Sequence, residues 1–236
     1  MITLNNYSKH YGSLKALSEI NLSIPGGSLT FLVGPNASGK TTLIKSLLGL
    51  VKPTSGEIVV NGITLNGDYN YRKEIGYVSQ IANFPENLTV DEIFRMVKDL
   101  RDNRTNYDEE LVSDFQLEQA FKKRLKTLSG GTRQKVNVAV AFLFDPKIII
   151  LDEPTAGLDP VASSLLKDKI LKENKKGKTI IFTSHILSEM EELAQNVVFL
   201  LEGKIFFNGT IKDLINSTNQ QNLERAIASI MNGAQK

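Results

Sequence analysis

The strongest indication of the fold lies in residues 29–42, which read Leu29-Thr-Phe-Leu-Val33-Gly34-Pro-Asn-Ala-Ser-Gly39-Lys40-Thr41-Thr42. Its first residues are apolar or β-branched and predict a strand, and the next match the pattern G-x-x-x-x-G-K-[ST]. Residues 41–50 have helical spacing, so a helix is expected directly after the loop. A strand, a glycine-bearing loop and a helix in this order indicate a phosphate-binding loop, because backbone N–H groups and a helix N-terminus attract an anion.

The residue types in this loop suggest individual roles. Glycine permits close approach of the backbone to phosphate, Lys40 neutralises the β- and γ-phosphates, and Thr41 supplies a hydroxyl to Mg²⁺. The sequence therefore predicts a nucleotide and Mg²⁺ as ligands. The nucleotide-binding residues expected in the loop are Gly34, Pro35, Asn36, Ala37, Ser38, Gly39, Lys40, Thr41 and Thr42.

A second apolar run, residues 148–151, ends in the carboxylates Asp152 and Glu153. Taken alone, it is a strand leaving the core at a polar turn. Beside a phosphate loop, Asp152 is the expected ligand of Mg²⁺, directly or through water. Glu153 could orient and deprotonate an attacking water. The combination favours a nucleotide-hydrolysing enzyme over a passive nucleotide binder.

Composition excludes several classes. The 236 residues include no Cys, which excludes a disulfide scaffold, Cys-ligated zinc and a catalytic thiol. A net charge of +2 argues against a dedicated polyanion binder, so no nucleic-acid partner is expected. The longest apolar-rich run, residues 136–144, is shorter than the about 20 residues that span a bilayer. With no export signal visible after Met1, we expect a cytoplasmic protein, and any membrane span must come from another chain.

The chain changes character twice. Short β-rich runs fill the first third, and from about residue 86 to 145 helical patterns dominate. Thr89-x-x-Glu92 predicts a capping box that opens an amphipathic helix to about Leu100, and residues 134–144 predict a buried helix. After Pro146 strands and helices alternate, as expected for a parallel sheet. These patterns predict an α/β core with a helical insertion.

The C-terminal tail, residues 218–236, is polar with a weak amphipathic pattern. We expect it to form a short peripheral helix outside the main domain. Asp159-Pro160 is expected to cap and start the helix between the apolar runs 147–151 and 179–184, with Pro at the first helical position.

The segment Leu128-Ser-Gly-Gly-Thr-Arg-Gln134 opens the buried helix. Ser followed by two glycines is common before helices, but it also offers a second anion site at a helix N-terminus. Here the sequence resembles the ATP-binding cassette (ABC) family over about residues 1–217. The motifs that carry the resemblance are GPNASGKTT, YVSQ with Gln80, LSGGTRQ, IIILDEP, AGLD ending at Asp159, and TSH ending at His185.

The resemblance implies a fold and a set of partners. The fold is an α/β P-loop NTPase core with an N-terminal antiparallel β-subdomain and a helical subdomain inserted at about 86–145. The implied activity is ATP hydrolysis coupled to transport, with ATP and Mg²⁺ bound by a homodimer of ATPase protomers. The membrane partner is an integral permease, which would hold this chain at the inner face of the cell membrane.

The resemblance also implies roles for residues outside the loop. Tyr11 would stack on adenine, Gln80 would contact Mg²⁺ or water and sense the permease, and His185 would contact the γ-phosphate. Asp159 would cross a dimer interface. The other protomer's nucleotide would meet the signature residues Ser129, Gly130 and Gly131.

Two residues depart from the family pattern. Thr132 stands where the family usually has Gln, and Ala37 stands where the phosphate loop often has Gly. Neither change removes a catalytic group. Thr132, however, alters the contacts that the signature can make.

Within the family, DEPTAGLDP and SHILSEMEELA are similar to the bacterial ABC-2 type export group. The segment DEPTAGLDPVASSLLKDKI is similar to the ATPase of the copper and nitrous-oxide-reductase maturation system. A soluble ABC ATPase in translation or DNA maintenance is the alternative, although no sustained heptads and no second cassette are present. A nucleotide-gated binding subunit with little turnover is a third reading, disfavoured because Glu153 and His185 are both present.

Overall fold

The computed structural model describes residues 1–67, 69–101 and 106–233. By its internal contacts the chain divides into two compact units. The first unit comprises Met1–Tyr71 and Ile181–Lys236, and the second comprises Arg72–Ile180. The domain boundaries expected from the sequence stay a prediction, because units defined by internal contacts are not the same as the domain of a protein family.

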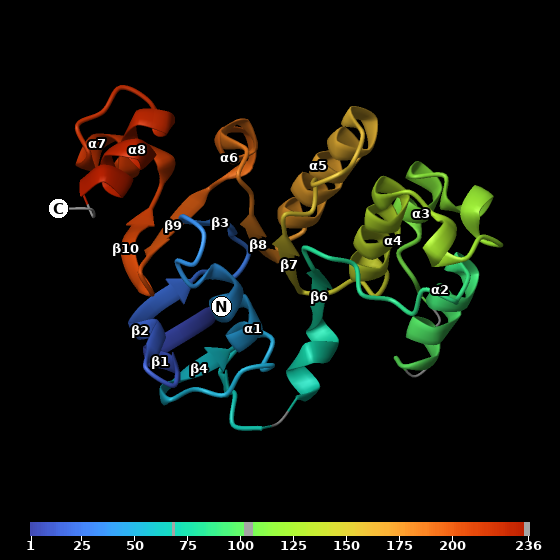
Figure 1. Ribbon diagram of the computed structural model, residues 1–236, viewed down its shortest axis with the longest axis horizontal. Coiled ribbons are helices and arrows are strands. Elements are labelled where there is room, and N and C mark those ends of the chain that lie inside the picture. The colour runs from blue at the N-terminus through green and yellow to red at the C-terminus, as the bar shows by residue number, and fades with distance from the viewer. Residues whose placement is uncertain (68, 102–105, 234–236) are drawn as a thin grey trace. The chain divides into compact units, whose positions relative to one another are not determined.

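The first unit is built on two groups of strands (Figure 1). An antiparallel sheet has the order β2-β1-β4-β5, and β3 pairs in parallel with β9, which pairs antiparallel with β10. The strand bounds are β1 Ile2–Tyr11, β2 Leu14–Ile24, β3 Leu29–Val33, β4 Ser55–Val60, β5 Ile63–Thr64, β9 Asn196–Leu201 and β10 Lys204–Gly209.

Helices of the first unit follow its strands. Helix α1 begins directly after the phosphate loop, and α6, α7 and α8 belong to the C-terminal part of the chain. Their bounds are α1 Lys40–Leu47, α6 Leu187–Leu193, α7 Ile211–Ser217 and α8 Leu223–Gly233. Helix α8 lies in the segment where a short helix was expected. It buries Leu223, Ala226 and Ile230, so one face packs against the unit.

The second unit joins a parallel strand pair to several helices. Strands β6 (Ile75–Val78) and β7 (Ile148–Asp152) pair in parallel. Between them lie α2 (Val90–Asp99), α3 (Glu110–Asp114) and α4 (Gly130–Phe142), with 3-10 turns around them. Helix α5 (Pro160–Lys175) follows β7, and β8 (Thr179–Thr183) runs across the division between the units.

Local sequence signals explain where these helices begin. The expected capping box is present, because Thr89 Oγ1 accepts from the Glu92 N–H and the Glu92 carboxylate accepts from the Thr89 N–H. Asp159 caps α5 and Pro160 is its first residue. Helix α4 is capped by Ser129 and buries most of its apolar residues, as the sequence predicted.

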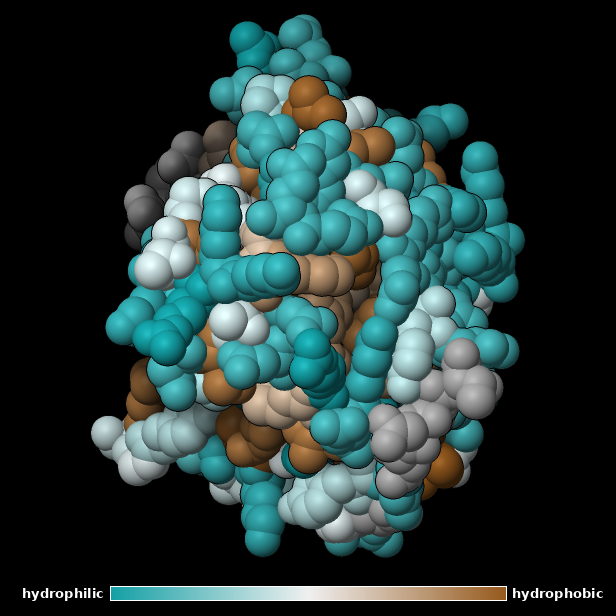
Figure 2. All heavy atoms as spheres, turned by 90° about the vertical axis from the view of Figure 1, so that its right-hand side faces the viewer, coloured by the Kyte–Doolittle hydropathy of each residue, from teal (hydrophilic) through white to brown (hydrophobic). Residues whose placement is uncertain are grey.

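Each unit has its own apolar core. In the first, Phe31 and Phe182 stack with ring centroids 4.6 Å apart. In the second, Phe94 of α2 packs near Phe121, with centroids 6.1 Å apart. Figure 2 shows the face on the side of α2 and α3, where hydrophilic side chains surround a few apolar ones. No helix among the described residues combines the length and apolar character needed to cross a bilayer.

The α/β class with an antiparallel N-terminal sheet and helices inserted after β6 is confirmed. Among the strands and α-helices that the structure describes, four escaped the sequence analysis: β2, β5, β10 and α7. The register of β2 against β1 shifts at several points, so its alternation of buried and exposed residues is broken.

Candidate functional site

The phosphate loop joins β3 to α1 in the first unit. Gly39 is the residue before the helix and has a φ of 109°, and the helix begins at Lys40. The Lys40 ammonium donates to the carbonyl oxygens of Gly34 at 2.7 Å and of Pro35 at 2.9 Å. The loop thus encloses a fixed positive charge at the N-terminus of a helix, which is an arrangement suited to phosphate.

Two glycines of the loop are needed for close packing. A Cβ on Gly34 would stand 2.0 Å from the carbonyl oxygen of Leu200, which lies on β9. A Cβ on Gly39 would stand 2.7 Å from the carbonyl oxygen of Ala16 on β2. Any larger residue at either position would push the loop off these strands.

The departure at Ala37 has a backbone counterpart. Ala37 has a φ of 63°, a left-handed conformation that glycine adopts without strain. The conformation of the loop therefore favours Gly here, and Ala adopts the same shape at a modest cost.

The other loop residues differ in exposure. Asn36 and Thr41 are exposed, and Thr42 is half-buried with its carbonyl oxygen accepting from Ser46 Oγ at 2.7 Å. Ser38 is buried, and its Oγ has no hydrogen-bond partner among the described residues. The Ser38 carbonyl accepts at 2.9 Å from the Gly203 N–H in the turn after β9.

Tyr11 and His185 also belong to the first unit. Tyr11 ends β1, is 47% exposed, and has the Lys9 ammonium 4.8 Å from its ring centroid. His185 is exposed in the short segment between β8 and α6. The neighbouring Ser184 hydroxyl donates to the buried Glu189 carboxylate at 2.5 Å and accepts from the Ile186 N–H at 3.0 Å. This pairing fixes the turn that carries His185.

In the second unit, the carboxylates Asp152 and Glu153 stand at the end of β7. Asp152 is 7% exposed, and Glu153 is half-buried with a φ of 49°. Burial, together with the negative charge of Asp152, raises the pKa of Tyr77 on β6 to about 12. Asp152 therefore places a negative charge in a poorly solvated region, where a divalent cation would offset it.

Gln80 is exposed and comes two residues after β6. The residue before it, Ser79, accepts a hydrogen bond at its carbonyl oxygen from the Asn137 amide of α4, at 2.9 Å. The segment carrying Gln80 is thus tied to the helix that the signature opens.

The signature occupies the N-terminus of α4. Ser129 Oγ accepts from the Thr132 N–H at 3.2 Å and lies 2.9 Å from the Thr132 hydroxyl. Thr132, the departure from the family pattern, thus contacts the signature serine directly. A Cβ on Gly131 would stand 2.7 Å from the Gly157 carbonyl oxygen, whereas Gly130 has open space around it.

Asp159 links the loop after β7 to the signature helix. Its Oδ1 accepts from the Ala162 N–H at 2.9 Å, and its Oδ2 lies 2.7 Å from the Lys135 ammonium of α4. The hydrogen bond from Lys135 is the main cause that lowers the pKa of Asp159, and the bond from Ala162 adds to it.

The second unit therefore brings together four of the expected segments: the end of β6 before Gln80, the end of β7, the signature and Asp159. Sequence reasoning assigned no joining role to the side chains that connect them, Gln134, Lys135 and Asn137. The signal was present, because these are polar residues within an otherwise apolar helical run. It also missed Glu189, whose burial at the start of α6 leaves no mark in the sequence pattern.

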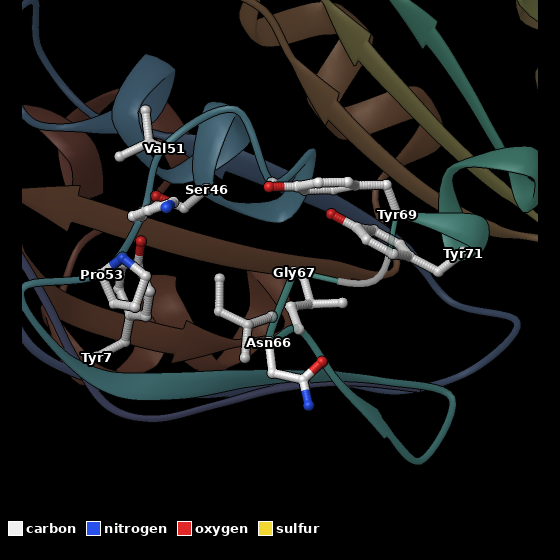
Figure 3. A pocket seen from close by; sticks show the side chains of 12 residues that line it. Tyr7, Ser46, Val51, Pro53, Asn66, Gly67, Tyr69 and Tyr71 are labelled. Atoms are coloured by element: carbon white, nitrogen blue, oxygen red, sulfur yellow. The ribbon is translucent and has the colours of Figure 1, made fainter.

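Two other features do not coincide with the expected site. A pocket of about 350 Å³ in the first unit has Tyr7, Tyr69 and Tyr71 in its wall, and none of the expected nucleotide-binding residues lines it (Figure 3). In the second unit, Asp108, Asp145 and Glu173 have carboxylate oxygens within 4.8 Å of one another. Lysines already pair with these carboxylates, so they form an ion-pair network rather than a metal centre.

Comparison with known proteins identifies the family. The family model described as ABC transporter matches residues 17–156. The lantibiotic transport ATP-binding protein SrtF of Streptococcus pyogenes is 34% identical over 94% of this chain and 95% of its own. A probable sulfate/thiosulfate import ATP-binding protein of Chlorella vulgaris is 40% identical, over 90% and 92% of the two chains.

Solved structures agree with the sequence comparison. An ATP-binding subunit of an ABC transporter superposes with a TM-score of 0.90 at 28% identity, covering 98% of this chain and 99% of that one. A dimeric cassette in a post-hydrolysis state bound to ADP and Pi has a TM-score of 0.79 at 27% identity, covering 89% and 98%. None of these relatives is named for translation or DNA maintenance. The chain belongs to the ABC transporter family, as one of its ATP-binding and ATP-hydrolysing cassettes.

Proposed function

We propose that two copies of this cassette share ATP between them and drive a separate membrane permease. The observation that carries the proposal is that two groups suited to an anion lie in different units. Lys40 is fixed inside the phosphate loop of the first unit, and Ser129 caps a helix in the second. The dimeric cassette bound to ADP and Pi supports the use of both groups, since it is similar over most of its chain.

Phosphate binding is assigned to the loop from Gly34 to Thr42. The Lys40 ammonium neutralises the β- and γ-phosphates, and N–H groups at the start of α1 donate to phosphate oxygens. Ser38 is buried with an unpaired hydroxyl, which supports a further donor role toward phosphate. Tyr11, exposed at the end of β1, is assigned to stacking on adenine.

Magnesium fits the residues available. Thr41, Gln80 and Asp152 are assigned as its ligands, and all three offer the oxygen atoms that Mg²⁺ prefers. The burial of the Asp152 carboxylate, which is 7% exposed, supports a nearby divalent cation. Bound Mg²⁺ would neutralise charge that develops on the phosphate oxygens.

Hydrolysis is assigned to Glu153, with Gln80 and His185 as its partners. Glu153 accepts a proton from water as the water oxygen bonds to the γ-phosphorus and the bond to the bridging oxygen of ADP breaks. His185 donates to a γ-phosphate oxygen, and Gln80 orients the water. The products are ADP and inorganic phosphate.

The dimer is assigned from the signature side. Ser129, Gly130 and Gly131 of one copy would contact the γ-phosphate bound by the other copy, and Asp159 would lie at the same interface. ATP would then stabilise the dimer by mass action, because its contacts to both copies exist only when they associate.

The permease is assigned as a separate integral membrane protein that holds the cassette at the inner face of the membrane. Export is the proposed direction, supported by the resemblance of DEPTAGLDP and SHILSEMEELA to the ABC-2 type export group. Two relatives named for export are a lipopolysaccharide export protein of Haemophilus influenzae, 33% identical, and a Nod factor export protein of Rhizobium etli, 32% identical. The finer proposal is the copper and nitrous-oxide-reductase maturation system. Normal assembly of that reductase after deletion of this chain would reject it.

A mixing experiment tests the shared site. Lys40→Ala lacks the phosphate-loop charge and Ser129→Arg blocks the signature, and Glu153→Gln is added to both chains to stop turnover. Each mutant homodimer has two broken sites, whereas the mixed dimer has one intact site. We expect light scattering to detect ATP-dependent association only in the mixture. Association no greater than that of the separate mutants would reject the shared site.

A further inference from the structure

Helix α4 carries two buried amide side chains, Gln134 and Asn137, which we call the amide pair. Gln134 is 6% exposed and Asn137 is 4% exposed, and their helical neighbours Val136 and Val138 are fully buried. Buried amides are costly unless each polar atom finds a partner, so the bonds that they make explain their presence in an apolar helix.

The amide pair connects two loops through a chain of hydrogen bonds. Asn137 Nδ2 donates to the Ser79 carbonyl at 2.9 Å and to Gln134 Oε1 at 3.3 Å. Gln134 Nε2 donates to the Pro154 carbonyl at 3.0 Å. Ser79 immediately precedes Gln80, and Pro154 immediately follows Glu153. The series of hydrogen bonds therefore ends on two backbone carbonyl groups, and each of them adjoins a residue assigned to hydrolysis.

The main chain at Glu153 needs such support. Glu153 has a φ of 49°, in the left-handed region that residues other than glycine occupy at a cost. A conformation of this kind persists only when surrounding bonds hold it. The Ala156 N–H donates to the Glu153 carbonyl at 3.2 Å on one side, and the Gln134 amide holds Pro154 on the other.

The position of α4 over β6 is also fixed. A Cβ on Gly76 would stand 2.1 Å from the Ala141 carbonyl oxygen, so only glycine at this position lets α4 approach β6 this closely. The amide pair sits on the same helix, within about two turns of its N-cap residue Ser129. Because α4 is held closely against β6, the amide pair has a fixed position relative to the segments that follow β6 and β7.

From these contacts we propose that Gln134 and Asn137 are positioning residues for hydrolysis. They hold the main chain next to Glu153 and next to Gln80 in one arrangement, and they attach both to the helix that begins with the signature. This inference rests on the proposed roles of Glu153 and Gln80. Neither amide touches the nucleotide in this assignment, so their loss should slow hydrolysis while leaving nucleotide affinity intact.

The test compares three variants of the whole chain. Gln134→Met and Asn137→Leu keep the approximate volume and remove the amide donors. Asn174→Leu is the matched control, because Asn174 is also buried in the second unit and donates to a main-chain oxygen, that of Lys178. That acceptor lies in the turn between α5 and β8, away from Gln80 and Glu153 in the sequence. All three changes should lower thermal stability.

Two measurements separate positioning from stability. We expect Gln134→Met and Asn137→Leu to lower the single-turnover hydrolysis rate by about tenfold or more, as small displacements of reacting groups do. The dissociation constant for ATP should stay within about twofold of wild type, as a pure positioning role requires. Hydrogen–deuterium exchange should quicken in peptides covering residues 79–81 for Asn137→Leu and 153–156 for Gln134→Met. The control should change neither rate nor exchange there.

The outcomes are distinct. Equal hydrolysis rates in the amide variants and in Asn174→Leu would overturn the inference while leaving the proposed function intact. If Glu153→Gln hydrolyses ATP like wild type, the proposed role of Glu153 fails instead. Should Gln134→Met not fold, Asn137→Ser, which removes the Ser79 contact with a smaller change, decides through the same rate and exchange measurements.

Discussion

The Lys135 ammonium and the Asp159 carboxylate stand 2.7 Å apart, which joins the signature helix to the loop after β7 within one chain. Asp159 also caps α5, so this carboxylate serves two elements at once. The pair is partly solvated, with the Asp159 side chain half exposed. This ion pair therefore contributes little to stability, and its main effect is to set the geometry of the loop.

Lys135→Met should raise the pKa of Asp159 toward its ordinary value, because the hydrogen bond from Lys135 is the main cause that lowers it. The N-cap bond from Ala162 remains, so the rise should be partial. Carboxyl NMR titration of wild type and variant measures the shift directly. Lys122→Met is the control, since Lys122 is exposed. A pKa of Asp159 that is the same in both proteins would contradict the pairing.

Lys40→Ala and Glu153→Gln should separate binding from chemistry. Loss of the Lys40 ammonium should weaken ATP binding by about 1.5–3 kcal/mol, the range for hydrogen bonds to charged groups. Glu153→Gln should leave binding unchanged and slow hydrolysis by about 10²–10⁴-fold, because an amide cannot accept the proton of water. Equilibrium binding and phosphate release measure the two effects. Steady-state turnover of Glu153→Gln within a few-fold of wild type would remove Glu153 from its role.

Tyr11→Ala should lower ATP affinity by about 1–3 kcal/mol, which is the range for stacking of a base on an aromatic side chain. The exposure of Tyr11 at 47% leaves the ring available to a base. Tyr11→Phe and Tyr11→Trp should bind like wild type, since stacking does not need the hydroxyl. Fluorescence titration with ATP and GTP gives the affinities. Equal affinities for the Ala and Tyr forms would place the adenine elsewhere.

The ion-pair network around Glu173 should make the protein sensitive to acid. Burial would raise the pKa of this fully buried carboxyl, but hydrogen bonds from Lys176, Lys178 and Lys169 outweigh it and lower the pKa to about 2. The ordinary value is about 4.3. A lowered pKa in the folded state contributes stability above about pH 4.3, and that stability is lost as the pH falls toward 2.

Glu173→Gln should test the same network. At pH 7 the change leaves buried lysine charge less well paired, and breaking such a pair typically costs about 3–5 kcal/mol. Its unfolding free energy should then fall less between pH 5 and pH 3 than that of wild type. Urea unfolding at the two pH values measures this, with the exposed Glu191→Gln as control. An acid dependence equal to that of wild type would show that other carboxylates dominate.

The parts of the fold that could be predicted from sequence are those with local causes. The cap at Thr89, the start of α5 at Pro160 and the loop before Lys40 all depend on neighbouring residues. Strand β2 and strand β10 could not be seen in the same way. Each pairs with the strand directly before it in the chain, but the register of both pairs shifts, which a rule of strict alternation does not anticipate.

For the candidate site, the sequence names candidate residues, and these stay predictions, but it does not show the bonds that hold them. Nothing near Gln134 in the sequence shows that its amide reaches Pro154, because that contact depends on how α4 packs. The left-handed φ of Glu153 was equally hidden, since no glycine stands there to reveal it. The preference for Gly at the position of Ala37, in contrast, is explained once its φ is known.

The two units differ in how their chain is assembled. The second is one continuous segment, whereas the first is made of the beginning and the end of the sequence. Gly34 rests against Leu200, and the Ser38 carbonyl accepts a bond from the Gly203 N–H, so the phosphate loop takes its shape from residues far later in the sequence. The loop is therefore synthesised long before the residues that shape it. A nascent chain that stalls before β9 would carry the complete loop sequence without the strand that shapes it, and could not yet bind ATP as the finished protein does.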